Sequence, residues 1–157
     1  MQHMRIHVAL TVSDVERSLQ FYRALFQADP TKVRDDYAKF ELEDPALHLA
    51  LNLDPEGVRP LPSHSHFGIQ LAGSDEVRGQ LDRLRQAGFR TDVEDQVTCC
   101  YSVQDKFWVV DPDGHPWELF VVTEANAGRR GNSQARLDAS TNARKESGCC
   151  ASTCCTE

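Results

Sequence analysis

The sequence lacks several features that would place it in a large functional class. It has no apolar run approaching the length of a membrane span, and its first residues lack the apolar stretch of a signal peptide. It has 24 acidic and 17 basic side chains, a formal net charge of −7, and so lacks the basic footprint that nucleic acid requires. We therefore expect a cytoplasmic protein that binds neither membranes nor nucleic acids.

The C-terminal segment 125–157 lacks the side chains that build a core. It contains no Val, Ile, Met or aromatic residue, and its single Leu is Leu137. Such a segment cannot bury enough apolar surface to fold, so we expect a disordered tail after a domain at 1–124. The chemistry of the tail lies in two cysteine pairs, Cys149-Cys150 and Cys154-Cys155.

Isolated cysteines are also missing, because all six occur as three adjacent pairs. In a reducing compartment this usage indicates metal or metalloid chemistry more than a disulfide framework. The pair in the body is Cys99-Cys100, whose Cα atoms can lie only ~3.8 Å apart, too close for an unstrained disulfide. Two adjacent thiols can chelate a soft ion. The alternative is that they are two small buried apolar residues.

The body contains one pattern twice. The segment HVALTV at 7–12 recurs as HFGIQL at 66–71, and each copy continues into a helical stripe and three strands. We expect Ser13 and Ser74 to cap the two helices and Gly88 to follow the second. The predicted strands after the helices are 32–36, 37–43, 47–53, 90–99, 101–110 and 116–122.

This pattern predicts an α+β protein of two βαβββ modules, at about 4–54 and 65–122. Each module should form a small antiparallel sheet with a helix on one face, so that the two open faces enclose a cleft. The sequence leaves open whether the modules pair within one chain or between the two chains of a homodimer.

Three residues of the body predict a metal site. His7 and His66 occupy matching positions of the repeat, each on the less apolar side of its strand. Glu118 lies on the last strand, where its neighbours Trp117 and Leu119 should face the other way. Two imidazoles and one carboxylate form a facial triad that leaves positions open, as non-haem Fe(II) oxygenases require. We interpret the other histidines, His3, His48, His64 and His115, as surface or supporting residues.

The motifs "YAKFELEDPALHLALN", "HFGIQL" and "TCCYSVQDKFWVVDPDGHPWE" carry a resemblance. Over roughly residues 4–122 the chain resembles the vicinal oxygen chelate superfamily, the glyoxalase/bleomycin-resistance/dioxygenase group. Within it, the motifs are similar to one branch, which contains the organoarsenical C–As lyases and the cadmium-induced proteins.

The resemblance implies an enzyme that uses Fe(II) and O₂ to cleave the carbon–arsenic bond of methylarsenite or aryl arsenites, in arsenic resistance. It also implies that His7, His66 and Glu118 hold the metal, and that Cys99 and Cys100 capture trivalent arsenic. Tyr101 is interpreted as a wall or proton donor of the pocket, or as a packed strand residue. Asp105 and Lys106 are placed on the loop after the cysteine pair, where they can shape the entrance.

Two other functions stay open. A glyoxalase or thiol transferase would share the His/His/Glu site but would have no need for Cys99 and Cys100. A cadmium- or arsenite-sequestering protein would use all three cysteine pairs. Detection of inorganic arsenite released from methylarsenite distinguishes these from a lyase.

Overall fold

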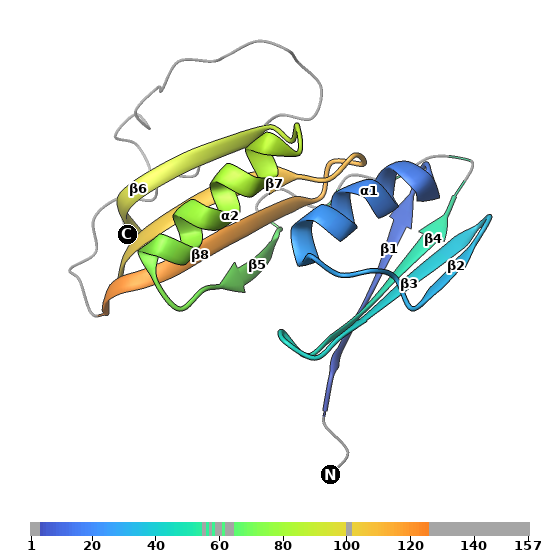
Figure 1. The fold of residues 1–157 in the computed structure, drawn as a ribbon, viewed down its shortest axis with the longest axis horizontal. Coiled ribbons are helices and arrows are strands. Elements are labelled where there is room, and N and C mark those ends of the chain that lie inside the picture. The colour runs from blue at the N-terminus through green and yellow to red at the C-terminus, as the bar shows by residue number, and fades with distance from the viewer. Residues whose placement is uncertain are drawn as a thin grey trace, which may run out of the picture.

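A computed structural model describes residues 4–54, 56, 58, 61, 65–99 and 102–125, without the side chains of 95–99, 102 and 125. These residues form two units with the same order of elements, one strand, one helix and three strands (Figure 1). The first unit comprises β1 (Ile6–Val12), α1 (Val15–Phe26), β2 (Lys32–Arg34), β3 (Tyr37–Leu42) and β4 (Leu47–Leu53). The second comprises β5 (Phe67–Gln70), α2 (Ser74–Gln86), β6 (Thr91–Cys99), β7 (Ser102–Val110) and β8 (Pro116–Ala125). The predicted α+β class and the duplicated βαβββ module are confirmed.

Each unit contains one four-stranded sheet. The first sheet has the order β1-β4-β3-β2 and the second the order β5-β8-β7-β6. Strand β1 pairs with β4 in parallel, as β5 does with β8, whereas the other pairs are antiparallel. The expectation of purely antiparallel sheets is therefore wrong. The crossover through the helix returns the chain to its original direction, so the strand after the helix runs parallel to the first strand of the unit. The two hairpins then reverse the direction twice, so the last strand also runs parallel to the first.

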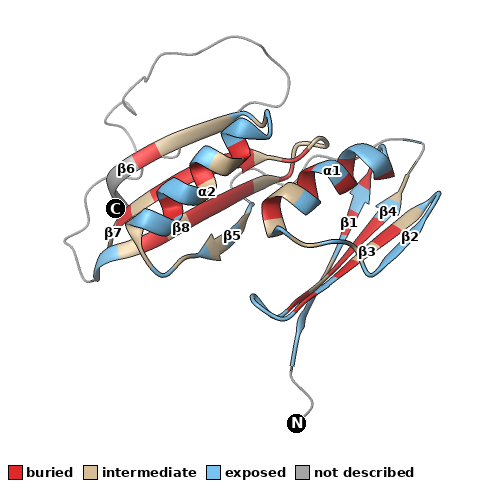
Figure 2. Ribbon diagram, viewed as in Figure 1, coloured by how far each residue is buried: buried red, intermediate tan, exposed pale blue. Residues whose placement is uncertain are grey.

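The helices cover one side of the sheets, and the core lies beneath them (Figure 2). The apolar stripe that the sequence predicts for the first helix comprises Val15, Leu19, Tyr22 and Phe26. The first three are buried on α1 and Phe26 is partly buried, while the buried face also includes Phe21 and Leu25. The start of β1 is an exception to its predicted apolar face. Met4 and Ile6 are 93% and 70% exposed, because the helix covers only the later part of the strand.

Both helix caps differ from their prediction. Asp14, one residue after Ser13, caps α1 by accepting a hydrogen bond from the backbone N–H of Arg17 at 2.9 Å. The N-cap of α2 is Gly73, which offers no side chain, while the Ser74 hydroxyl donates to Asp105 Oδ2 at 2.7 Å. Neither serine caps its helix, because the hydroxyls of Ser13 and Ser74 donate instead to Asp113 and Asp105, which are distant in the sequence. Gly88 follows α2 with a φ of +87°, as predicted.

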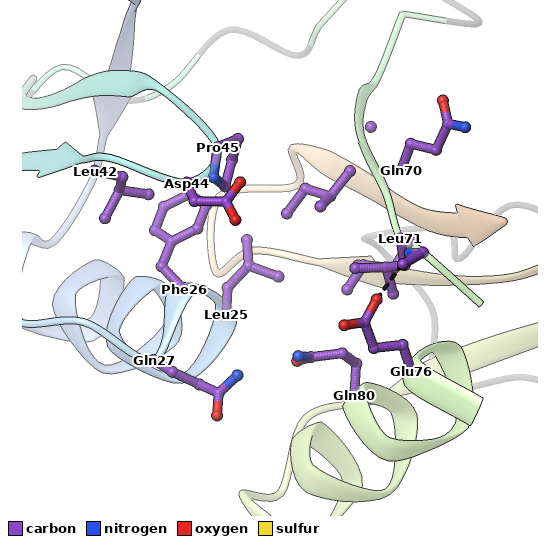
Figure 3. Close-up of a pocket in the computed structure, with 14 residues that line it drawn as sticks. Leu25, Phe26, Gln27, Leu42, Asp44, Pro45, Gln70, Leu71, Glu76 and Gln80 are labelled. Atoms are coloured by element: carbon purple, nitrogen blue, oxygen red, sulfur yellow. Dashed lines mark hydrogen bonds between the residues drawn. The ribbon is translucent and has the colours of Figure 1, made fainter. Parts of the chain in front are cut away.

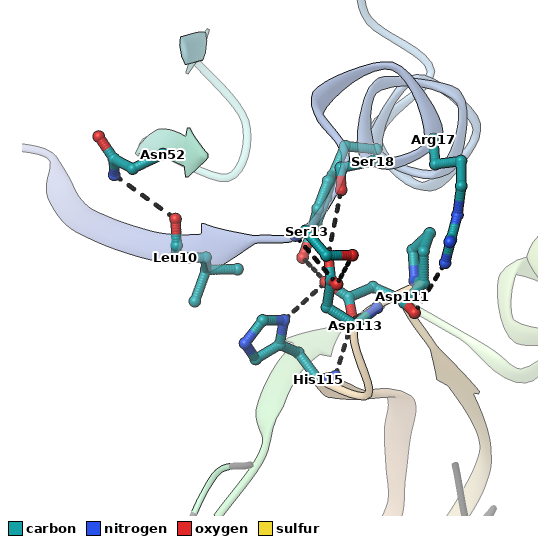
Figure 4. A network of polar contacts seen from close by, with 10 residues as sticks. Leu10, Ser13, Arg17, Ser18, Asn52, Asp111, Asp113 and His115 are labelled. Atoms are coloured by element: carbon teal, nitrogen blue, oxygen red, sulfur yellow. Dashed lines mark hydrogen bonds and ion pairs between the residues drawn. The ribbon is translucent and has the colours of Figure 1, made fainter. Parts of the chain in front are cut away.

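A buried polar network joins the two units (Figure 4). The hydroxyl of Tyr22, on α1, donates to Asp111 Oδ2 at 2.7 Å, and His115 Nδ1 lies 2.7 Å from the same oxygen. Burial, together with the charge of Asp111, raises the pKa of Tyr22 well above its usual value. Nearby, Ser13 N–H donates to Asp113 Oδ1 at 3.1 Å. His115 is thus a buried residue of the junction between units.

The described residues include no helix with the length and apolarity needed to cross a membrane. An open pocket of about 690 Å³ lies between the end of α1, the β3–β4 turn, β5 and the start of α2 (Figure 3). Its lining includes Gly68 and Leu119 but none of the predicted metal ligands.

Candidate metal centre

The second sheet brings two of the predicted ligands together. Glu118, in β8, is buried, and its Oε2 lies 3.6 Å from Nε2 of His66, directly before β5. Gly68 stands opposite Glu118 in the parallel pair β5–β8. A Cβ at Gly68 would lie 3.8 Å from Glu118 Oε2 and 3.4 Å from Phe120, which are ordinary contact distances, so this position adjoins the carboxylate without requiring glycine. His66 and Glu118 are therefore positioned to bind one ion together.

The third predicted ligand lies on the other sheet. His7 is exposed on β1, and no group of three His, Cys, Asp or Glu side chains within the described residues converges as a metal site. The strand register explains why the first unit cannot form this site alone. Ala9 pairs with Ala50 as Gly68 pairs with Glu118, so Ala50 occupies the position of the acid. The structure thus presents a two-ligand half-site and a separate histidine.

His7 has a neighbour that the sequence did not reveal. It stands opposite His48 of β4, and the two ring centroids are 4.5 Å apart. Nε2 of His48 is buried without a hydrogen-bond partner among the described residues. Two imidazoles on one open face, one with an unused nitrogen, are a donor set that suits Fe, Zn or Cu. Only the pairing of β1 with β4 brings His48 to this place.

A buried lysine adjoins the half-site. The prediction that Lys106 lies on a loop is wrong, because the residue lies within β7 and is 1% exposed. Its Nζ lies 2.9 Å from Glu118 Oε1 and 3.4 Å from Glu94 Oε2. An ammonium group loses much hydration when buried, and the two carboxylates compensate it. Residues 101–110 read from sequence as a strand, and the alternation along β7 places Lys106 on the open face of the sheet.

Trp108 completes this cluster. Its Nε1–H donates to Glu94 Oε1 at 3.2 Å, and its ring meets that of His66 edge-on, with centroids 5.0 Å apart. Lys106 Nζ lies 5.2 Å from the ring centroid, within range of a cation–π contact. Neither Glu94 nor Trp108 stands out in the sequence as a site residue. Each is unremarkable alone, and their roles depend on the lateral pairing of β6, β7 and β8.

The remaining predicted residues are Cys99, at the end of β6, and the two residues that follow it in the sequence. Cys99 ends β6 and stands opposite Ser102, but its side chain, Cys100 and Tyr101 lie outside the described residues. The pairing of β6 with β7 shifts register between Glu94 and Val97. Such a shift is typical of a β-bulge, which bends a strand locally. The arsenic-capturing role of the cysteines stays a prediction.

Comparison with known proteins gives consistent matches. The family model described as Glyoxalase/Bleomycin resistance protein/Dioxygenase superfamily matches residues 5–119. A "Trivalent organoarsenical cleaving enzyme" of Bacillus sp. (strain MD1) is 46% identical over 117 residues, 73% of this chain and 70% of that protein. "Cadmium-induced protein CadI" of Mycobacterium tuberculosis (strain ATCC 25618 / H37Rv) is 39% identical over 118 residues, 75% and 76% of the two chains.

A solved structure supports the fold. The crystal structure of a glyoxalase/bleomycin resistance protein/dioxygenase from Alicyclobacillus acidocaldarius superimposes with a TM-score of 0.63. The two chains are 17% identical, and the match covers 77% of this chain and 92% of the other. At this identity the likeness concerns the fold alone.

Proposed function

Because the chain belongs to the Glyoxalase/Bleomycin resistance protein/Dioxygenase superfamily, we propose that it is an enzyme that cleaves the carbon–arsenic bond of trivalent organoarsenicals. The observation that carries the proposal is the 46% identity to the trivalent organoarsenical cleaving enzyme of Bacillus sp.. The proposed substrates are methylarsenite and aryl arsenites, and the proposed product is inorganic arsenite. The role would be detoxification of arsenic in the cytoplasm.

The proposed cofactor is Fe(II), held by His66 and Glu118 together with His7. Imidazole and carboxylate donors suit this ion, and three protein ligands leave positions free. When bound, Fe(II) would supply the redox chemistry by which O₂ breaks the carbon–arsenic bond. Nε2 of His66 and Oε2 of Glu118, 3.6 Å apart, are the atoms best placed to hold it.

We propose that His7 reaches the half-site from a second copy of the chain. Supporting this, His7 is exposed, and the neighbouring Met4 and Ile6 present apolar side chains to solvent. Exposed apolar side chains beside an incomplete site are typical of a surface that a partner covers. A two-fold homodimer would build two equivalent sites, each with His7 from one chain and His66 and Glu118 from the other.

Mixing two inactive variants tests this arrangement. His7→Ala and Glu118→Ala should each be inactive as homodimers. When the two are co-expressed, a mixed dimer has one site with both defects and one intact site. Random pairing should then restore about one quarter of wild-type activity per protein. If each site forms within one chain, the mixture stays inactive.

The cysteine pair is the proposed capture site for arsenic. Trivalent arsenic is soft and binds dithiols, and each thiol must lose its proton to ligate it. A chelate through Cys99 and Cys100 would fix the arsenic atom and restrict the directions of its bond to carbon. This restriction is the proximity effect that the pair would contribute to catalysis.

The decisive experiment is product analysis. Purified protein loaded with Fe(II) is incubated with methylarsenite in air, and arsenic species are separated and quantified. We expect arsenite to accumulate over many turnovers, and to fail to accumulate without O₂. Methylarsenite that is bound stoichiometrically but not converted would contradict the proposal.

The second candidate is sequestration of cadmium or arsenite, which the cadmium-induced relatives and the three cysteine pairs favour. The same experiment separates the two, because a sequestering protein binds the metalloid without releasing a new species. A glyoxalase or thiol-transferase activity would instead require a glutathione adduct as substrate, and would be insensitive to loss of Cys99 and Cys100.

A further inference from the structure

We infer that Lys106 is a positioning residue that makes Glu118 a one-oxygen metal ligand. The two oxygens of Glu118 face different partners. Oε1 lies 2.9 Å from the ammonium of Lys106, and Oε2 lies 3.6 Å from Nε2 of His66. An oxygen held by a buried ammonium is not free to join the metal. The carboxylate therefore uses one coordination position, where it would otherwise occupy two.

Glu94 and Trp108 hold Lys106 in place. Glu94 and Lys106 stand directly opposite each other on β6 and β7, and Trp108 stands opposite Glu118 on β7 and β8. Glu94 receives the indole N–H of Trp108 at one oxygen and faces Lys106 with the other, 3.4 Å from Nζ. When both carboxylates are ionised, the ammonium of Lys106 offsets one of their charges. Glu94, Glu118 and Lys106 together then carry a net charge of −1. That single charge favours a cation at Oε2.

The first unit provides an internal control. The strand register matches Glu94 with Arg34, Lys106 with Tyr37, and Glu118 with Ala50. The unit without the acid thus also lacks the lysine and the second carboxylate. The fold itself does not require this buried charge cluster, because an equivalent sheet forms without it. The cluster occurs only with the carboxylate that it positions.

The inference rests on the proposed metal site, and it predicts opposite changes in metal affinity for two variants. In Lys106→Met a cation is lost and both oxygens of Glu118 become available, so divalent metal should bind more tightly. In Glu94→Gln the carboxylate of Glu118 is left as the partner charge of Lys106 in this cluster. The lysine then attracts Glu118 more strongly and competes better with the metal, so metal should bind more weakly. Each change should be at least tenfold, because charges a few ångströms apart interact at an effective dielectric of about 20 by more than the free energy of one tenfold step.

The measurement is anaerobic titration of the metal-free protein with Fe(II), and separately with Co(II), in the absence of any arsenical. Lys32→Met is the matched control, because it removes an exposed lysine on β2 and should leave the affinity unchanged. Circular dichroism and melting temperature report whether each variant is folded. General damage would weaken binding in both site variants, so affinities that fall together, or that do not change, would overturn the inference.

Where Lys106→Met does not fold, Glu94→Gln still tests the inference, because glutamine keeps the shape and an acceptor for Trp108. A Glu94→Gln affinity equal to or higher than that of the wild type would contradict it. Cleavage assays are run separately. Opposite affinity changes in a protein that releases no arsenite would leave the role of Lys106 standing and refute the proposed function.

Discussion

The two βαβββ units agree on the face of the sheet that meets the helix and differ on the open face. Beneath the helices, Leu49 and Leu51 of β4 are fully buried, as Leu119 is on β8. On the open face, Ala50 of the first unit stands where the second carries Glu118. Packing against a helix demands apolar side chains in both units, but the helix places no such demand on the other side of the sheet. The open face is therefore where one unit acquired chemistry that the other lacks.

The hairpins differ in the same way. In the first unit β2 and β3 contain three and six residues, whereas β6 and β7 of the second contain nine each. The added length carries Cys99 to the end of β6, beyond the bulge after Glu94. The second unit thus supplies most of the proposed site, and the first contributes His7 and its neighbour His48.

The largest effect should follow removal of a ligand from the second unit. Glu118→Ala and His66→Ala should each abolish turnover and bound iron while arsenical binding survives, because the triad and the dithiol are separate sites. Metal analysis of the purified proteins and methylarsenite binding are the measurements. Glu124→Ala, an exposed acid on the same strand, is the control. Wild-type iron content in both site variants would refute the assigned ligands.

The long hairpin should matter almost as much. Cys99→Ser or Cys100→Ser should weaken binding of trivalent organoarsenicals roughly 100-fold, since one thiol cannot chelate, and should leave iron content unchanged. A Cys149→Ser, Cys150→Ser double variant serves as a comparison at a pair outside both units. Normal rates of methylarsenite degradation in both hairpin variants would show that the pair does not capture substrate.

The junction between the units should have a moderate effect, on stability. Tyr22→Phe removes the hydrogen bond to Asp111 and should lower the free energy of unfolding by about 1–2 kcal/mol at neutral pH. Because the pKa of Tyr22 is raised in the folded state above 10.0, its contribution is present below that pH and is lost as pH rises through the folded value.

The difference between wild type and Tyr22→Phe should therefore narrow above pH 10.0. Urea denaturation at a series of pH values measures it, with Tyr37→Phe, at a partly exposed tyrosine, as the control. If the difference in free energy of unfolding between wild type and Tyr22→Phe stays constant to high pH, ionisation of Tyr22 does not oppose folding.

The smallest effect should come from the segment outside both units. Deleting 126–157, after the end of β8, should leave folding and turnover at saturating methylarsenite nearly unchanged. If this segment is disordered, as its composition predicts, chain statistics allow ~30 residues to extend about 30 Å, and the tail cysteines could then deliver substrate when it is scarce. Rates are compared across methylarsenite concentrations. Superimposable curves would exclude the tail from catalysis.

Sequence alone determined the duplicated units, the element boundaries to within a few residues, the positions of His7 and Glu118 on their strands, and that of His66 beside β5. These follow from local periodicity, because a strand alternates and a helix repeats every 3.6 residues whatever lies beside it. The match between HVALTV and HFGIQL further identified which residues are equivalent.

Only the tertiary structure decided which side chains meet. It paired His7 with His48, buried Lys106 between Glu94 and Glu118, and placed Ser13 at the junction of the units instead of at a helix cap. These contacts depend on the lateral register of strands far apart in the chain. Periodicity along one strand carries no information about that register, which is settled when the helices and sheets pack together.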